Sequence, residues 1–293
     1  MSQDVTSPAS ADLPSKVSAW LELADGTFHY TDVARDLRLS STTSLRKYLS
    51  RLANSKAIER IGTRSGYYRK VATEVQEIDW WNVADSEYPC IMPMGLNRLC
   101  VLHPGNIVVI AGESNSAKTA LLLDVARFNL ATHQVRYQCS EMKRFELRNR
   151  LQNYHEETTF EHWKKVQFVE RSDNHADILL PDGLNIIDYV EVHEEFYRVG
   201  SILREIHDNL NDGVAFIAMQ KKAGTDVGKG GHVTLEKPRL YMSVSFDHTP
   251  AGPVNVAKII KCKHYRDPET NPNGMIRQFK VYGGWKISPL GEW

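Results

Sequence analysis

The sequence has few cysteines, no long apolar run and no net charge. Its 293 residues include four scattered cysteines, Cys90, Cys100, Cys139 and Cys262, with no C-x-x-C pair and no histidines clustered at ligand spacing. This argues against a disulfide scaffold or a zinc site and favours a reducing compartment. No apolar run approaches the ~18 residues of a transmembrane helix, and the first residues, MSQDVTSPASADLPS, lack the features of a secretion signal. We therefore expect a cytoplasmic protein without a membrane partner.

The composition is that of a folded protein with an uneven charge distribution. Hydrophobic residues make up 42% and charged residues 25% of the chain, which excludes collagen-like and wholly disordered classes. The length predicts two domains. Basic and acidic residues both number 36, but residues 15–71 hold eleven of the basic ones and five of the acidic ones. A small basic domain is therefore expected to precede a larger, slightly acidic one.

Two segments lack a regular apolar pattern. Residues 1–14 are rich in Ser, Ala, Asp and Pro and are expected to form a disordered tail. Residues 72–100 contain Trp80-Trp81, Pro89, Pro93 and Gly95. We interpret this second segment as an irregular linker that wraps onto the domain that follows it.

Apolar spacing in residues 15–71 predicts three short helices. The first ends at Asp25-Gly26 and has an apolar face of Val17, Trp20, Leu21 and Leu23. The second is expected to be capped by Thr31. The third places Leu45, Leu49 and Leu52 at i, i+4 and i+7.

A basic hairpin follows the three helices, with predicted strands at 57–61 and 67–71. Three helices followed by such a hairpin resemble a winged helix-turn-helix domain. In that arrangement the third helix enters the major groove of DNA and the hairpin tip reaches a minor groove or a phosphate. The expected DNA contacts are Arg46, Lys47, Arg51 and Arg64. Winged helices also serve as protein-interaction modules, so a protein partner is the alternative.

From Asn106 onward, strand and helix patterns alternate, which is typical of an α/β fold with a mostly parallel sheet. The predicted domain spans residues 101–293. Its predicted strands are 107–110, 135–139, 166–169, 184–187, 214–219, 256–260, 276–281 and 285–287. Its predicted helices are 118–130, one from about Met142, and 196–210.

A strand and a helix flank a phosphate-loop pattern. It consists of Gly112, Glu113, Ser114, Asn115, Ser116, Ala117, Lys118 and Thr119. Such a loop supplies backbone N–H groups and a lysine for phosphates, and a hydroxyl for Mg²⁺. The pattern G-x-x-x-x-G-K-[ST] expects glycine where Ala117 stands. If that position has a positive φ, alanine costs about 1 kcal/mol there. The loop predicts binding of ATP with Mg²⁺.

Polar side chains follow three further predicted strands. Asp188 ends one strand and could hold the Mg²⁺ shell together with Thr119. Glu141 lies just past the second strand, and Gln220 ends the strand at 214–219. Ligands of open α/β sheets bind at the carboxyl edge of the strands, so these side chains are expected to converge there.

The region from about residue 89 to 287 resembles the RecA/DnaB-type core of P-loop ATPases. The likeness rests on Ser140-Glu141-Met142, Ile187-Asp188-Tyr189 and Ala218-Met219-Gln220. It implies that Glu141 polarises the attacking water and that Gln220 senses the γ-phosphate. It also implies that a basic motif reaches the nucleotide of a neighbouring subunit. Lys261, Lys263 and Arg266 are the candidates for that motif, with a solvated basic strand end as the alternative.

The resemblance also implies a nucleic-acid contact at residues 221–239, which follow Gln220 directly. This segment is rich in Gly and Lys, so its backbone could follow a phosphate chain. The charges would come from Lys221, Lys222 and Lys229. A flexible surface loop is the alternative interpretation.

These expectations combine into a DNA-binding, Mg-dependent ATPase that self-associates into a ring or filament. A role in replication, recombination or repair of single- or double-stranded DNA would follow, as helicase, recombinase-like filament or loader. The compact arrangement would suit a phage or another mobile element. The alternative is a DNA-binding regulatory or loader-type protein that holds ATP as an assembly switch with little hydrolysis. Glu141 favours hydrolysis, because a mere binding switch needs no water-activating carboxylate.

Overall fold

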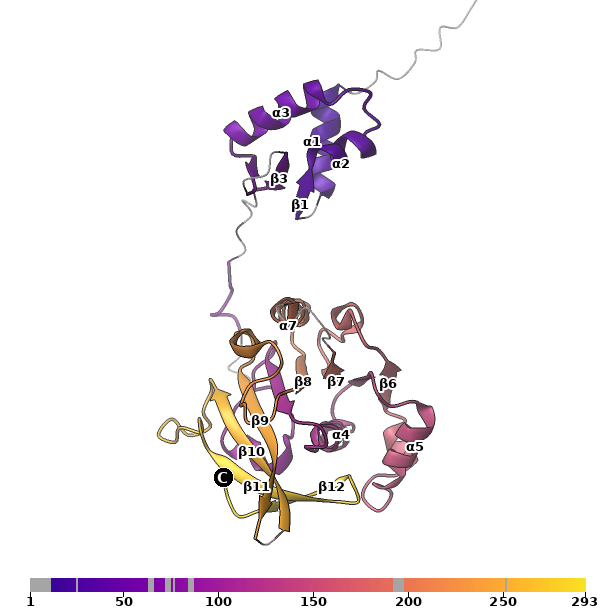
Figure 1. Ribbon diagram of the computed structural model, residues 1–293, viewed down its shortest axis with the longest axis vertical. Coiled ribbons are helices and arrows are strands. Elements are labelled where there is room, and N and C mark those ends of the chain that lie inside the picture. Colours follow the sequence, from indigo (N-terminus) through magenta and orange to yellow (C-terminus); the bar gives the residue numbers. More distant parts are fainter. Residues whose placement is uncertain are drawn as a thin grey trace, which may run out of the picture. The chain divides into compact units, whose positions relative to one another are not determined.

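The computed structural model describes residues 12–24, 26–62, 66–71, 75, 77–83, 87–191, 198–250 and 252–293. The chain forms two compact units, Met1–Asn82 and Val83–Trp293 (Figure 1). Most of the predicted tail, the proposed helix end at Asp25, the hairpin tip with Arg64 and the predicted helix start at 196–197 lie outside the described residues.

Three helices and a small antiparallel sheet make up the first unit. The helices are α1 (Leu13–Leu23), α2 (Tyr30–Asp36) and α3 (Thr43–Asn54). The strands are β1 (Thr27–His29), β2 (Ile58–Arg60) and β3 (Tyr67–Lys70), in the order β1-β3-β2. Their core is built from fully buried side chains of all three helices and of β2, namely Val17, Val33, Leu45, Leu49 and Ile58.

Three details of this unit differ from the sequence expectations. Helix α1 begins at Leu13, inside the predicted tail, because the side chain of Asp12 accepts a hydrogen bond from Ser15 N at 3.0 Å and caps it. His29, not Thr31, caps α2. Leu23 is 87% exposed, because it lies at the very end of α1, beyond the part that packs on the core.

The second unit is built on one nine-stranded sheet in the order β12-β11-β10-β9-β4-β8-β7-β5-β6. Strands from β9 to β6 pair in parallel, whereas β9 to β12 pair antiparallel. The strands are β4 (Ile107–Gly112), β5 (Val135–Cys139), β6 (Val166–Glu170), β7 (Leu184–Val190), β8 (Val214–Gln220), β9 (Leu240–Thr249), β10 (Gly252–Cys262), β11 (Ile276–Tyr282) and β12 (Lys286–Leu290). The expected α/β class is confirmed. Strand β9 was not predicted, and β7 runs past Asp188, where the sequence suggested its end.

Helices cover both faces of this sheet (Figure 1). Alternate residues of β4 point to opposite sides, so Val108 and Ile110 pack with α4 whereas Ile107 and Val109 pack with α7. The helices are α4 (Lys118–Asn129), α5 (Arg144–Gln152), α6 (Phe160–Trp163) and α7 (Val199–Asp208). Short 3₁₀ helices are η1 (Pro93–Arg98), η2 (His175–Ile178) and η4 (Gly231–Leu235). No helix among the described residues is long and apolar enough to cross a membrane.

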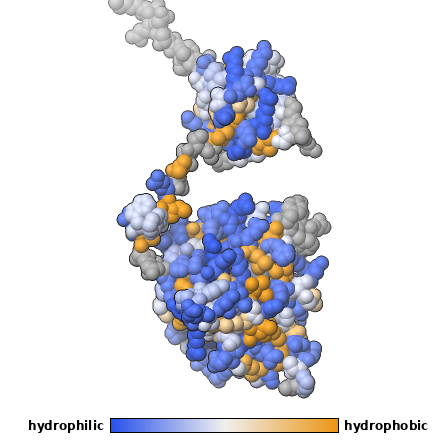
Figure 2. Space-filling view, turned by 90° about the vertical axis from the view of Figure 1, so that its left-hand side faces the viewer, coloured by the Kyte–Doolittle hydropathy of each residue, from blue (hydrophilic) through white to orange (hydrophobic). Residues whose placement is uncertain are grey.

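Residues 87–102, which include the end of the predicted wrapping linker, pack tightly within the second unit. The Asn129 side chain at the end of α4 accepts from Ile91 N at 2.7 Å and donates to Ile91 O at 2.9 Å. The carbonyl of Met94 accepts hydrogen bonds from Arg277 and from Trp293 Nε1. By contrast, Val75, Ile78 and Val83 in the segment that joins the two units are exposed. Figure 2 shows hydrophobic residues at the surface of this segment.

Candidate nucleotide-binding site

The loop between β4 and α4 has the backbone of an anion-binding turn. Ala117 has φ 70° and ψ 17°, in the left-handed region that favours glycine. The structure therefore meets the condition under which alanine costs about 1 kcal/mol. Gly112 allows a close approach, because a Cβ at this position would lie 2.8 Å from Lys118 Cγ. Ser116 Oγ donates to Glu113 O at 2.8 Å and closes the turn.

Lys118, the first residue of α4, lies buried beneath this loop. Its Nζ donates to Glu113 O at 2.8 Å and to Gln220 Oε1 at 3.1 Å. Burial lowers the pKa of Lys118, while the nearby carboxylates of Asp188 and Glu141 act in the opposite direction. A buried ammonium whose hydrogen-bond acceptors are neutral oxygens is well suited to an anionic ligand. The triphosphate of a nucleotide would supply that charge.

Asp188 on β7 is the deepest carboxylate of the site. Tyr137 Oη on β5 donates to its Oδ2 at 2.7 Å, and the Thr119 side chain also hydrogen-bonds to it. Burial raises the pKa of Asp188, although these hydrogen bonds and the Lys118 charge oppose the effect.

Thr119 and Asp188 are oxygen donors of the kind that Mg²⁺ prefers. Within the described ranges, no group of three or more His, Cys, Asp or Glu side chains could hold a metal ion by itself. The residues present therefore fit an ion that arrives with the nucleotide phosphates and keeps part of its water shell.

Glu141 follows β5 and lies in the same cavity as Lys118 and Asp188. Burial, followed by the charge of Asp188, raises its pKa, whereas Lys118 lowers it. A carboxylate with a raised pKa is a stronger base than an ordinary one and can orient and polarise a water molecule.

These groups line one open cavity of about 520 Å³, a volume suited to a nucleotide. Gln220, at the end of β8, is hydrogen-bonded to two residues of the loop region. Its Oε1 accepts a hydrogen bond from Lys118, and its Nε2 donates one to Ser114 Oγ at 2.9 Å. The cavity thus brings together the loop and the predicted residues Glu141, Asp188 and Gln220. Sequence reasoning missed the remaining lining residues, Ala120, Glu146, Arg150, Phe246, Val281 and Gly284.

The three predicted finger residues do not line this cavity in the described part of the chain. Lys261 Nζ donates to the carbonyls of Leu235 and Glu236. Arg266 donates to both carboxylate oxygens of Glu87, one of them at 2.6 Å. Lys263 is exposed. Lys261 and Arg266 are therefore occupied within their own chain.

The predicted DNA-binding lysines differ in exposure. Lys221 is 3% exposed, and its Nζ contacts Ser245 Oγ at 2.8 Å and Glu113 Oε1 at 3.3 Å. The expectation that Lys221 contacts DNA does not agree with this burial. Lys222 and Lys229 are exposed.

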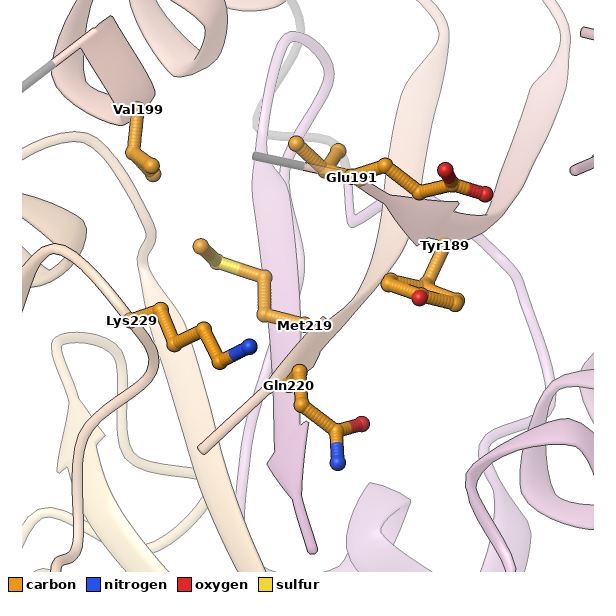
Figure 3. Close-up of a pocket in the computed structure, with 7 residues that line it drawn as sticks. Tyr189, Glu191, Val199, Met219, Gln220 and Lys229 are labelled. Atoms are coloured by element: carbon orange, nitrogen blue, oxygen red, sulfur yellow. The ribbon is translucent and has the colours of Figure 1, made fainter. Parts of the chain in front are cut away.

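Lys229 lies beside Gln220. Its backbone N–H donates to Gln220 O at 2.8 Å, and both residues line a small cavity with Tyr189, Glu191 and Met219 (Figure 3). This hydrogen bond links the segment 221–239 to the glutamine that contacts Lys118.

On the first unit, α3 presents Arg46, Lys47 and Arg51 to solvent, while Leu45 and Leu49 are buried. The Arg46 guanidinium lies over the ring of Tyr30, 5.0 Å from its centre. These three cations form one exposed basic helix face.

No protein-family model and no curated protein sequence matches the chain. Among solved structures, a KaiC-like protein from the hyperthermophilic archaeon Pyrococcus horikoshii is similar, with a TM-score of 0.54 and 12% identity over 70% of this chain and 99% of that one. The RadB recombinase is also similar, with a TM-score of 0.49 and 14% identity over 64% of this chain and 92% of that one. The flagellar accessory protein FlaH from Methanocaldococcus jannaschii has a TM-score of 0.48 and 12% identity over 64% of this chain and 90% of that one. Only the first score exceeds 0.5, and at such low identity it bears on the fold alone. The second unit therefore has an α/β fold with a large mostly parallel sheet, and the chain shares its fold with that KaiC-like protein.

Proposed function

We propose that the protein is a Mg-dependent ATPase that hydrolyses the β–γ bond of ATP. The observation that carries the proposal is the convergence of Lys118, Thr119, Glu141, Asp188 and Gln220 on one nucleotide-sized cavity. Lys118 and Thr119 begin α4, and the other three lie at or just past the ends of β5, β7 and β8. The fold brings any residues at these positions to one edge, but it does not require them to be charged or polar. Phosphoryl transfer depends on positioning and charge neutralisation, which is what this set offers.

Each side chain has a role in that reaction. The loop amides and Lys118 hold the phosphates, while Thr119 and Asp188 hold the metal. Mg²⁺, when bound, would offset the negative charge of the β- and γ-phosphates. Glu141 orients a water molecule and accepts its proton. Gln220 exchanges its contact with Lys118 for one with the terminal phosphate.

We propose that the first unit is a winged helix-turn-helix DNA-binding domain within residues 15–71. Its order of three helices and three strands, and the basic face of α3, support this proposal. Lys222 and Lys229 supply a second DNA contact, which reaches the ATP site through the bond of Lys229 to Gln220. Assembly into a ring or filament and a role in replication, recombination or repair follow as parts of the same proposal.

Steady-state ATPase activity, measured without DNA and with single- or double-stranded DNA, tests the proposal. Wild-type protein is expected to hydrolyse ATP with Mg²⁺, faster with DNA, and Lys118→Ala to lose turnover because the main charge on the phosphates is gone. Unchanged turnover in Lys118→Ala would remove this site from the reaction. Tight ATP binding without turnover in the wild type would favour the assembly-switch alternative.

A further inference from the structure

An arginine with no assigned role faces the nucleotide cavity. Arg150 on α5 lines the same space as Lys118, Glu141 and Asp188. Its side chain is 32% exposed, so most of it is enclosed by protein. Its charge also acts on Asp188, where it opposes the rise in that pKa.

Arg150 is loosely held, unlike Lys261 and Arg266. Its Nη2 lies 4.0 Å from Glu146 Oε1, at the limit of an ion pair and beyond hydrogen-bond distance. Arg266, by contrast, donates hydrogen bonds to both carboxylate oxygens of Glu87, and Lys261 donates to two backbone carbonyls. The guanidinium of Arg150 can therefore turn to a new anionic partner at little cost.

The rotation of α5 explains why this arginine and not its neighbour faces the site. Glu146 and Arg150 are four residues apart and share a helix face, and both line the cavity. Arg148 lies on another face, with its guanidinium 4.8 Å from the ring centre of Phe160. Arg148 is thus a matched control on the same helix.

We propose that Arg150 binds the terminal phosphate of ATP from within the same subunit and stabilises the charge that develops there during hydrolysis. This rests on the proposed ATPase function. Water oxygen bonds to the γ-phosphorus as the bridging P–O bond breaks, its electron pair leaves with ADP, and Glu141 takes the water proton. Arg150 donates hydrogen bonds without giving up a proton, as its permanently charged planar guanidinium is suited to do.

The test compares Arg150→Ala, Arg150→Lys and Arg148→Ala. We expect Arg150→Ala to lower kcat by about 10²–10³-fold, as for loss of one transition-state donor. It should bind ADP normally but bind non-hydrolysable ATP analogues and ADP–aluminium fluoride more weakly, because ADP lacks the terminal phosphate. Arg150→Lys should recover part of the loss, and Arg148→Ala should resemble the wild type. Thermal unfolding of each variant confirms that it is folded.

A mixture separates an intramolecular arginine from one supplied by a neighbour. Arg150→Ala mixed with Lys118→Ala should remain inactive, because every site then lacks one of the two cations. Recovery on mixing, wild-type turnover in Arg150→Ala, or equal weakening of ADP and ADP–aluminium fluoride binding would each overturn the inference. Absence of ATPase activity in the wild type would instead contradict the proposed function. The affinities of Arg150→Ala for ADP and for ATP analogues would still test whether Arg150 binds the terminal phosphate.

Discussion

The hydroxyl of Tyr137 donates a hydrogen bond of 2.7 Å to Oδ2 of Asp188. The two residues lie on the neighbouring parallel strands β5 and β7, and both side chains are buried. The bond fixes the orientation of the carboxylate beneath the phosphate loop. It does not remove the cost of burying the charge, because the pKa of Asp188 is raised in spite of it.

Asp188→Asn is therefore expected to stabilise the nucleotide-free protein while it abolishes Mg-dependent turnover. The pKa of Asp188 is higher in the folded protein than its value of 3.8 in the unfolded chain. Protonated Asp188 therefore favours folding at a pH below 3.8, and this contribution to stability is lost as the pH rises through the pKa of the folded state. At neutral pH the amide should therefore raise the free energy of unfolding, and with it Tm, relative to the wild type. Thermal unfolding at pH 3 and pH 7 checks this, because the advantage of Asn should grow as the pH rises above 3.8, the pKa of the unfolded aspartate. An Asn variant that is less stable at both pH values would contradict the argument.

Glu141→Gln should keep ATP binding and lose about 10²–10⁴-fold in turnover, because an amide cannot accept the water proton. Burial and Asp188 raise the pKa of Glu141 above its ordinary 4.5, so wild-type activity should fall on acidification at a pH above that value. Single-turnover hydrolysis across pH, with nucleotide binding measured in parallel, tests both points. Normal hydrolysis by Glu141→Gln, with loss in Glu191→Gln, would show that the base was assigned to the wrong residue.

Ala117→Gly should leave stability unchanged or raise it by up to about 0.6 kcal/mol. The φ of 70° strains alanine by about 1 kcal/mol, but glycine loses about 0.4–1 kcal/mol more conformational entropy on folding. ATPase should be equal or mildly higher. Urea unfolding and steady-state turnover measure the two effects, and a clear loss of stability would mean that the methyl group is needed for packing.

Replacing Arg46, Lys47 and Arg51 together by Ala should weaken binding of duplex DNA. The slope of log affinity against log salt should shrink by up to about 2.7, because three fewer phosphates are neutralised. Basal ATPase should stay near the wild-type value. Fluorescence anisotropy over a salt series tests this, with Lys16→Ala on α1 as the control. A loss of DNA-free ATPase in the triple variant would show instead that the first unit supports the core.

Among Lys261, Lys263 and Arg266, we expect Arg266 to have a structural role and Lys263 to have an intersubunit role. Arg266→Ala should lower Tm at every protein concentration, as should Glu87→Ala, and the double variant should add little, because the two residues form one pair. Lys263→Ala should leave Tm unchanged and lower turnover. If Lys263 acts on a neighbour, mixing Lys263→Ala with Lys118→Ala in the presence of DNA should restore activity. Co-assembly without recovery would exclude Lys263 as the finger.

The sequence predicted the sheet and the meeting of its polar strand ends because both depend on local patterns. Buried runs mark parallel strands, and residues just past them share one edge whatever the details of packing. Lys118, Asp188 and Gln220 could be placed together on this ground. Strand β9 was not predicted, because residues 221–239 were interpreted as a loop and the next predicted strand began only at residue 256.

Other site features depend on tertiary geometry that the sequence does not encode locally. Whether Arg148 or Arg150 faces the cavity is set by the rotation of α5. Phe246 reaches it through the β9–β10 hairpin. Lys221 was predicted to be exposed because it stands in a run of Gly and Lys, yet strand β9 provides Ser245 as a half-buried hydrogen-bond partner.

The packing of residues 87–102 has a practical consequence for shortening the chain. Tyr88, Cys90 and Met92 belong to the same buried cluster as the leucines of α4, and Met94 O is bonded to Trp293. A fragment that begins at residue 101, the predicted boundary, would leave that apolar strip open to water and would be prone to aggregate. Fragments for expression should begin before Glu87, and an affinity tag on Trp293 needs a spacer so that its indole can still reach Met94.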